Sequence, residues 1–380
     1  MKNSDLSRSA LFLAVFAAIC CFTLWPFERA TAQQYRVYVA AESDDEVALV
    51  TFDANTGQGF VEDVVGVGQY PTETEGPHGI TVSPDGDHWF VSVAHGNPYG
   101  WLYKFTTGDN NFVERTELGL FPASMEVSAL TGLLYVINFN LHGDMEPSTV
   151  SVVDPEAMEV VREITTGIMP HGSRISSDGK RQYHVSMMTD ELMEINTLTM
   201  DISRRLNVAP ETSASAGSPD ATMHQASHNA HPKPRAKPTW ADPHPAKSLV
   251  YVANNGSDEA VEVDTKSWKV TRRFNTGKGP YNLEVSHDGK LLVVTYKGEG
   301  ATGVWDLEEG RELAKIKNSR LVSHGVSISP DNRFAFISVE GKNGEPGSVD
   351  VIDLHKLELA EVIEVGKQAG GIMHWKMTEE

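Results

Sequence analysis

The stretch GPHGITVSPDGDHWFVSVAH, Gly76–His95, contains the unit that decides the fold. A Pro-His-Gly entry leads into a short β-branched strand, a Ser-Pro-Asp-Gly turn and a second apolar strand. Its first half recurs as MPHGSRISSDG at Met169–Gly179 and, in part, as VSHGVSISPDN at Val322–Asn332. Self-similarity at a fixed period is typical of repeat architectures. The recurrence therefore predicts a fold built from repeated strand-and-turn units.

The unit repeats along the whole chain. Successive strand entries are 42–48 residues apart, except for one interval of 68 residues. The entries begin at Pro77, Pro122, Pro170, Pro238, Pro280, Ser323 and Ala369. The units consist of strand-length apolar runs between Gly, Asp and Asn turns, without a helical period. This spacing is typical of four-stranded propeller blades, and the long interval predicts a mobile insertion at residues 209–237, which is poor in large apolar residues.

The two ends of the chain complete one further unit. YRVYVAAES, EVALVTFD and FVEDVVGVG supply strands two to four of a blade that lacks its first strand. GGIMHWKM, near the carboxyl end, reads as a first strand that lacks its followers. Pairing the two parts would close the ring and remove exposed sheet edges. We therefore predict an all-β, seven-bladed β-propeller over residues 33–380, closed by the C-terminal strand.

The amino terminus has the pattern of a secretory signal peptide. Lys2 and Arg8 precede an apolar run at residues 10–27, which is followed by Ala-Thr-Ala at residues 30–32. We predict cleavage after residue 32 and a periplasmic or secreted location, with an uncleaved anchor as the alternative. No later segment reaches the roughly 18 apolar residues of a membrane span, so we expect no span after cleavage.

Charge and cysteine content narrow the classes of partner. The chain has 32 basic and 52 acidic residues, a formal net charge of −20. An acidic surface repels phosphate backbones, so we expect no nucleic-acid partner, whereas cations and cationic proteins are compatible. Cys20 and Cys21, the two cysteines, lie in the predicted signal peptide. The exported domain would therefore have no disulfide and no thiolate metal ligand.

Three segments resemble a known repeat family. VYVAAES (37–43), LYVINFN (134–140) and VYVANNGSDEAVEVD (250–264) are similar to the YVTN-type repeat, in which Tyr-Val-Thr-Asn precedes a strand that ends in Asp. The chain thus resembles exported YVTN propellers, a superfamily that includes the propeller of nitrous oxide reductase and the d1-haem propellers. The resemblance implies the propeller fold and, in outline, a redox role that an electron-transfer partner would have to support. Propellers host unrelated chemistries, so it specifies function weakly.

Histidines occupy a selected position in three blades. His78, His171 and His324 each stand at the second residue of the innermost strand, in blades two, four and seven. The remaining blades have Ala123, Thr239, Tyr281 and Gly370 there. The blade itself therefore does not require histidine, and three imidazoles from three sides could bind one metal ion at the tunnel mouth. The alternative is that Pro-His-Gly is only a favourable strand entry. We expect the following glycine to let the backbone turn.

Further candidate ligands surround this opening. The second strands of six blades end in different residues, namely His95, Phe139, Met188, Asn255, Lys297 and Glu340. Of these, His95, Met188 and Glu340 could ligate a metal, and imidazole with thioether favours copper, although methionine often only fills gaps between blades. The insertion adds His224, His228 and His231, which could collect a metal or cover the mouth, or belong to a plain linker.

We call the face on which the innermost strands begin and the second strands end the upper face. We therefore expect an exported propeller that binds a transition metal, with copper favoured, at the tunnel mouth on this face. Whether it is an enzyme stays open, and no catalytic residue is assigned. One alternative is a non-enzymatic propeller that binds a small molecule or a partner protein on the same face. Another is a lactonase-like hydrolase that uses Glu126, Glu284 and Glu340 on a divalent cation. No Gly-x-Ser-x-Gly, P-loop or His-Glu-x-x-His motif is present.

Overall fold

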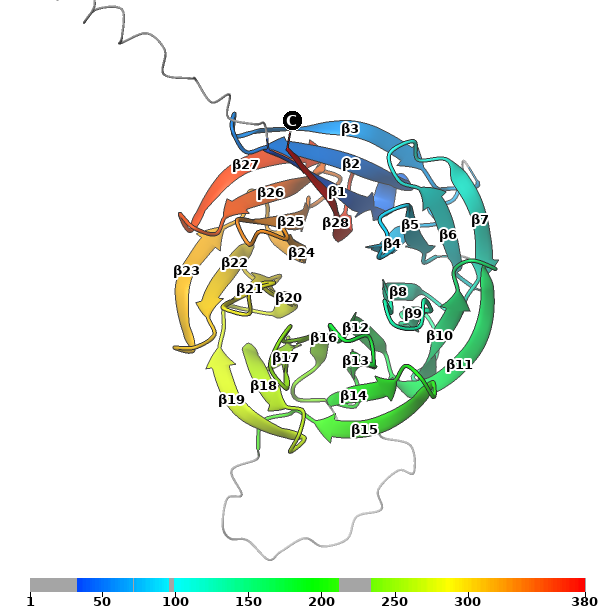
Figure 1. Ribbon diagram of the computed structural model, residues 1–380, viewed down its shortest axis with the longest axis vertical. Coiled ribbons are helices and arrows are strands. Elements are labelled where there is room, and N and C mark those ends of the chain that lie inside the picture. Colours follow the sequence, from blue (N-terminus) through cyan, green and yellow to red (C-terminus); the bar gives the residue numbers. More distant parts are fainter. Residues whose placement is uncertain (1–32, 71, 96–98, 212–233, 380) are drawn as a thin grey trace, which may run out of the picture.

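Seven antiparallel four-stranded sheets are arranged in a ring in the computed structural model, with their innermost strands around the axis of the expected tunnel (Figure 1). The structure describes residues 33–70, 72–95, 99–211 and 234–379. The predicted signal peptide and the central part of the insertion, with His224, His228 and His231, lie outside the described residues. The prediction of an all-β, seven-bladed propeller is confirmed.

Each blade runs from an innermost strand beside the tunnel to an outermost strand at the rim (Figure 1). Blade 1 contains β28 (Ala369–Glu379), β1 (Gln33–Ala41), β2 (Glu46–Asp53) and β3 (Gln58–Gly66), with the short 3-10 helix η1 (Glu42–Asp44) after β1. Blade 2 contains β4 (Pro77–Val82), β5 (His88–Val93), β6 (Trp101–Thr106) and β7 (Phe112–Glu117). Blade 3 contains β8 (Pro122–Val127), β9 (Leu134–Asn138), β10 (Pro147–Asp154) and β11 (Glu159–Ile168). Blade 4 contains β12 (Pro170–Ile175), β13 (Arg181–Ser186), β14 (Glu191–Asn196) and β15 (Asp201–Asn207).

The remaining blades follow the same order. Blade 5 contains β16 (Pro238–Pro243), β17 (Leu249–Asn254), β18 (Glu259–Asp264) and β19 (Lys269–Asn275). Blade 6 contains β20 (Pro280–Val285), β21 (Leu291–Tyr296), β22 (Ala301–Asp306) and β23 (Arg311–Lys317). Blade 7 contains β24 (Val322–Ile328), β25 (Phe334–Glu340), β26 (Gly347–Asp353) and β27 (Glu358–Val365). In blade 1, β28 pairs with β1, so the two chain ends close the ring as predicted.

The hydrophobic core lies between successive blades. Tyr35 and Phe52 of blade 1, for example, pack against Phe334 and Phe336 of blade 7, and similar clusters join the other neighbouring blades. The inner strands are buried on both faces, whereas the outermost strands alternate exposed and half-buried residues. Because the core is divided among these interfaces, each innermost strand is held by the blades on either side of it.

The His-Gly pairs lie where the innermost strand meets the next blade. A Cβ added to Gly79 would stand 1.6 Å from the carbonyl oxygen of Ala123, and one added to Gly172 would stand 2.4 Å from that of Thr239. Gly79, Gly172 and Gly325 do not have a positive φ. The close approach of the neighbouring backbone is therefore what excludes a side chain at these glycines.

Hydroxyl groups of the preceding blade hold the backbone of two of the histidines. The Ser124 hydroxyl donates to the carbonyl oxygen of His171 at 2.7 Å, and the Thr295 hydroxyl donates to that of His324 at 2.8 Å. These bonds fix the strand at the residue whose side chain enters the tunnel mouth.

The edges of the predicted insertion are anchored to the ring. Ala209 and Ala236 are buried in the core between blades 4 and 5. The Asp190 carboxylate accepts the backbone N–H groups of Arg235, Ala236 and Lys237. Among the described residues, no helix is long and apolar enough to cross a membrane.

Candidate functional site

The three predicted histidines meet at the tunnel mouth. The ring centre of His78 lies 6.1 Å from that of His171 and 5.7 Å from that of His324, edge to face in both cases. All three residues are buried. They come from β4, β12 and β24, the innermost strands of blades 2, 4 and 7. The structure thus brings these imidazoles together, although His171 and His324 are 93 and 246 residues from His78 in sequence.

A buried carboxylate from blade 1 connects two histidines. Glu42 of η1 accepts the Nδ1–H of His78 at 3.0 Å and the Nε2–H of His95 at 2.8 Å. Burial alone would raise the pKa of Glu42, but the charges and hydrogen bonds of the two imidazoles outweigh it and place the pKa well below its usual range. Glu42 is therefore a carboxylate that orients His78 and leaves its Nε2 free of this contact.

His171 is fixed on both sides of its ring. Its Nδ1–H donates to the carbonyl oxygen of Thr239 at 2.9 Å, and the Tyr281 hydroxyl donates to its Nε2 at 3.0 Å. Burial, together with the charge of His78, lowers the pKa of His171 to about 3. The imidazole is therefore neutral at physiological pH, with its lone pair on Nε2. Burial also raises the pKa of Tyr281, so its hydroxyl keeps its proton.

His324 is beside a half-buried ion pair. Its Nε2 is 3.8 Å from Glu340, whose carboxylate also binds the Lys297 ammonium at 2.9 Å. Burial and the Lys297 charge hold the pKa of His324 well below its ordinary value. Its Nδ1 is buried without a hydrogen-bond partner. Lys297 also lies 4.2 Å from the ring centre of Tyr281.

Two phenylalanines form the apolar side of the mouth. The Phe121 ring contacts the rings of His78, His95 and His142 at centre distances of 4.9–5.5 Å. Phe139 contacts His171 at 4.7 Å. The Phe139 ring limits the access of His171 to water, in agreement with the dominant effect of burial on the pKa of His171.

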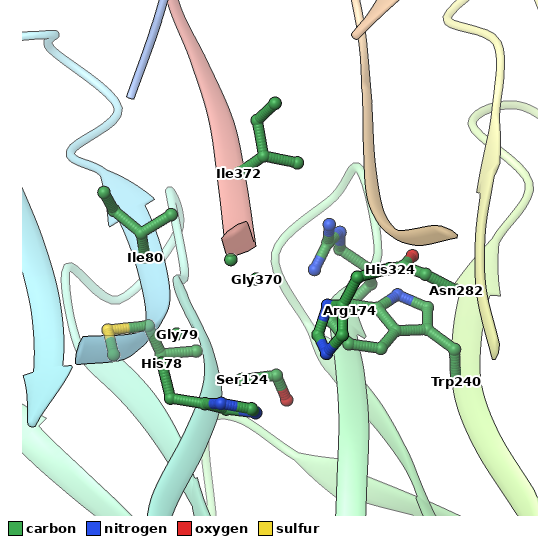
Figure 2. Close-up of a pocket in the computed structure, with 12 residues that line it drawn as sticks. His78, Gly79, Ile80, Ser124, Arg174, Trp240, Asn282, His324, Gly370 and Ile372 are labelled. Carbon is green, nitrogen blue, oxygen red and sulfur yellow. The ribbon is translucent and has the colours of Figure 1, made fainter. Parts of the chain in front are cut away.

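A small cavity lies beside the histidines (Figure 2). Its volume is about 30 Å³. Figure 2 shows His78 on one side and Arg174, Trp240, Asn282 and His324 on the other. The Arg174 guanidinium lies 4.9 Å from the Trp240 ring centre, and its Nη1 donates to the carbonyl oxygen of Ser173.

The other predicted ligands are placed differently. His95 joins the cluster through Glu42, and Glu340 lies beside His324, 3.8 Å from its Nε2. Met188 is half-buried after β13, and within the described part of the chain it makes no ring contact or side-chain hydrogen bond with the three histidines. The described residues contain no group of three or more His, Cys, Asp or Glu side chains that could hold a metal ion as they stand.

The carboxylates considered for a hydrolase have other partners. Glu126 accepts the backbone N–H of Ile175, and Glu284 accepts that of Ile328. Both bonds join one blade to the next. Glu340 is bound to Lys297. These contacts do not favour the lactonase-like alternative, which stays a prediction.

Sequence reasoning missed Glu42 although its signal was present. Glu42 ends VYVAAE in the same alignment that placed His95, Phe139 and the other residues at the ends of second strands. Extending that alignment to blade 1 would have found it. No sequence pattern predicted that Arg174 and Trp240 would line the cavity, because their positions depend on how blades 4 and 5 pack against each other.

Comparisons with known proteins support the architecture. No protein-family model and no curated protein matches this chain, so the YVTN-type assignment stays a prediction. Hydrazine synthase of Kuenenia stuttgartiensis is similar in structure, with a TM-score of 0.57 over 76% of this chain and 81% of that chain. The sequence identity is 20%. This similarity shows the fold alone.

Proposed function

We propose that this propeller binds a transition-metal ion, copper in the first place, through His78, His171 and His324. The observation that carries the proposal is the approach of the three imidazoles to ring-centre distances of 5.7 and 6.1 Å from His78. With metal–nitrogen bonds of about 2.1 Å, imidazoles that share one ion have ring centres roughly 5–6 Å apart. The two distances from His78 are therefore close to this range, while the Tyr281 ring centre lies 5.3 Å from that of His171 and 4.7 Å from that of His324.

Two of the three rings make outer contacts of a kind that metal-binding histidines often make. Such histidines usually donate their second ring N–H to a carboxylate or a backbone carbonyl. His78 donates to Glu42 and His171 donates to Thr239 in this way. His171 and His324 are neutral at physiological pH because their pKa values are lowered, so a metal need not displace a proton from them. Copper is the first candidate because Cu²⁺ binds imidazole most tightly among the divalent first-row ions.

Metal binding requires one local rearrangement. The Tyr281 hydroxyl occupies His171 Nε2, so it has to turn away before that nitrogen can ligate. The ammonium of Lys297, near His324, opposes a second cation, although Glu340 offsets its charge. A redox role would follow from copper at this position, with an electron-transfer partner on the upper face and an exported, periplasmic or secreted location.

The test is metal binding by the untagged exported domain. The protein is stripped with a chelator, loaded with Cu²⁺ or Zn²⁺, and analysed by elemental mass spectrometry and by competition titration. We expect one ion per chain, and its loss when His78, His171 and His324 are all replaced by alanine. His88→Ala, at the start of β5, is the matched control and should keep the metal. Equal metal content in wild type and the triple variant would overturn the proposal.

A non-enzymatic ligand-binding propeller is the second candidate. It is favoured by three buried polar atoms beside the cavity that have no hydrogen-bond partner, namely Trp240 Nε1, Asn282 Oδ1 and His324 Nδ1. This function needs no metal. It predicts a folded protein that binds no stoichiometric metal in the experiment above and still binds a small polar ligand in the tunnel.

A further inference from the structure

The cavity beside the histidine cluster has an unusual concentration of unsatisfied polar groups. Trp240, Asn282 and His324 are 8%, 4% and 5% exposed. Each has a polar atom that is buried without a hydrogen-bond partner. Since an unpaired buried polar atom costs roughly 1–3 kcal/mol, three of them around one cavity indicate that something with complementary polar atoms occupies it.

The cavity also contains a cationic group with spare donors. Within the described residues, the Arg174 guanidinium makes one hydrogen bond, from Nη1 to Ser173, and no ion pair. It lies over the Trp240 ring. A guanidinium presents five N–H donors in one plane, which suits planar oxygen acceptors that it can bind through two parallel hydrogen bonds. Most of this capacity remains for a ligand.

One of the unsatisfied atoms is a further donor. Indole Nε1–H of Trp240 can only donate. The Asn282 side chain can present either its oxygen or its NH₂ group to the cavity by rotating its amide. With Arg174, this makes a donor-rich site. We propose that the cavity binds a small planar oxyanion of the size of nitrate or formate, held by Arg174, Trp240 and Asn282.

The charges next to Arg174 are consistent with an anion. Asp242, Glu126 and Glu284 are the nearby acids, and each accepts a backbone N–H from the next blade. Burial raises the pKa of Asp242 to about 8 and that of Glu284 to about 7, and it also raises the pKa of Glu126. Asp242 therefore keeps its proton at neutral pH and adds no negative charge beside Arg174.

The size of the cavity limits the ligand. A volume of about 30 Å³ admits water molecules or a small ion, but not a sugar or a nucleotide. Water alone is the competing occupant. Water would also satisfy the donors, but an oxyanion is favoured because it can accept two parallel hydrogen bonds from the Arg174 guanidinium.

The test uses chelator-treated, metal-free protein and sodium nitrate as the probe in isothermal titration calorimetry. We expect one nitrate site per chain. Arg174→Met keeps the aliphatic stem and removes the charge, and Trp240→Phe removes the indole N–H. Each should weaken binding about tenfold or more. Arg162→Met, on the exposed outer strand β11, is the matched control and should change the affinity less than twofold.

The location is checked independently by anomalous diffraction from crystals soaked in bromide, with a peak expected beside Arg174. Wild type that binds no nitrate would overturn the proposal and leave water as the occupant. Unchanged affinity in folded Arg174→Met would also overturn it. If Arg174→Met does not fold, Trp240→Phe decides by the same criterion. Because the protein is metal-free and the histidines are intact, the result is independent of whether the metal proposal holds.

Discussion

Replacing Glu42 with glutamine should destabilise the propeller by about 2–3 kcal/mol at neutral pH. Glu42 is 7% exposed and accepts hydrogen bonds from His78 and His95. Hydrogen bonds to a charged group contribute about 1.5–3 kcal/mol each. A glutamine amide of the same shape keeps one acceptor and loses the charge, so we count the loss as about one such bond and part of the second.

The pH dependence gives the sign of this effect. The folded pKa of Glu42 lies well below its ordinary value of 4.5. A carboxylate with a depressed pKa stabilises the fold fully above the unfolded value, and this contribution is lost as pH falls towards the folded pKa. The difference between wild type and Glu42→Gln should therefore be present at pH 7 and should shrink below about pH 4.5.

The assay is urea denaturation followed by tryptophan fluorescence at pH 7 and at several values down to pH 3.5. Glu364→Gln is the matched control, since Glu364 forms an exposed ion pair with Arg320 and such pairs contribute about 0–1 kcal/mol. A loss below about 0.5 kcal/mol for Glu42→Gln at pH 7 would refute the reasoning, as would a difference that grows on acidification.

Three further perturbations have defined outcomes. Gly79→Ala should cost about 3 kcal/mol or more in urea denaturation, because its Cβ would overlap the neighbouring carbonyl. Gly66→Ala, which meets nothing within 4 Å, should cost less than about 1 kcal/mol. Tyr281→Phe should tighten copper binding several-fold in a competition titration, since it frees a histidine nitrogen, and weaker binding would count against ligation there. Nitrate affinity should fall between pH 6 and 9, because Asp242 and Glu284, with pKa values of about 8 and 7, gain negative charge near the bound anion. A flat calorimetric pH profile would contradict that assignment.

The fold was predictable because the repeat carries its own evidence. Strand entries such as Pro77 and Pro170 recur at nearly constant spacing, and the unmatched ends could only be completed by pairing β28 with β1. Hydrophobic alternation and turn residues act within a single blade. They therefore determine the number and order of strands without any knowledge of how blades contact one another.

The site was predictable only in part, for a related reason. The positions of His78, His171 and His324 follow from the repeat, so their approach to one another could be expected. Their partners do not follow from it. The bond from Tyr281 to His171 joins blades 6 and 4 across the tunnel, and no local pattern encodes a contact of that kind.

The packing role of glycine also escaped the sequence analysis. His-Gly suggests a turn when one strand is considered alone, whereas the structure shows that the carbonyl of the next blade lies where a Cβ would be. The distinction requires the distance between Gly79 and Ala123, which are in different blades.

The most direct test of the central claim is a crystal structure of the copper-loaded protein with diffraction data on both sides of the copper absorption edge. The account predicts one anomalous peak at the tunnel mouth within about 2.0–2.2 Å of nitrogen atoms of His78, His171 and His324, with the Tyr281 hydroxyl turned away from His171. A fully occupied copper peak elsewhere, or no peak at the mouth of a protein shown to be loaded, would contradict it.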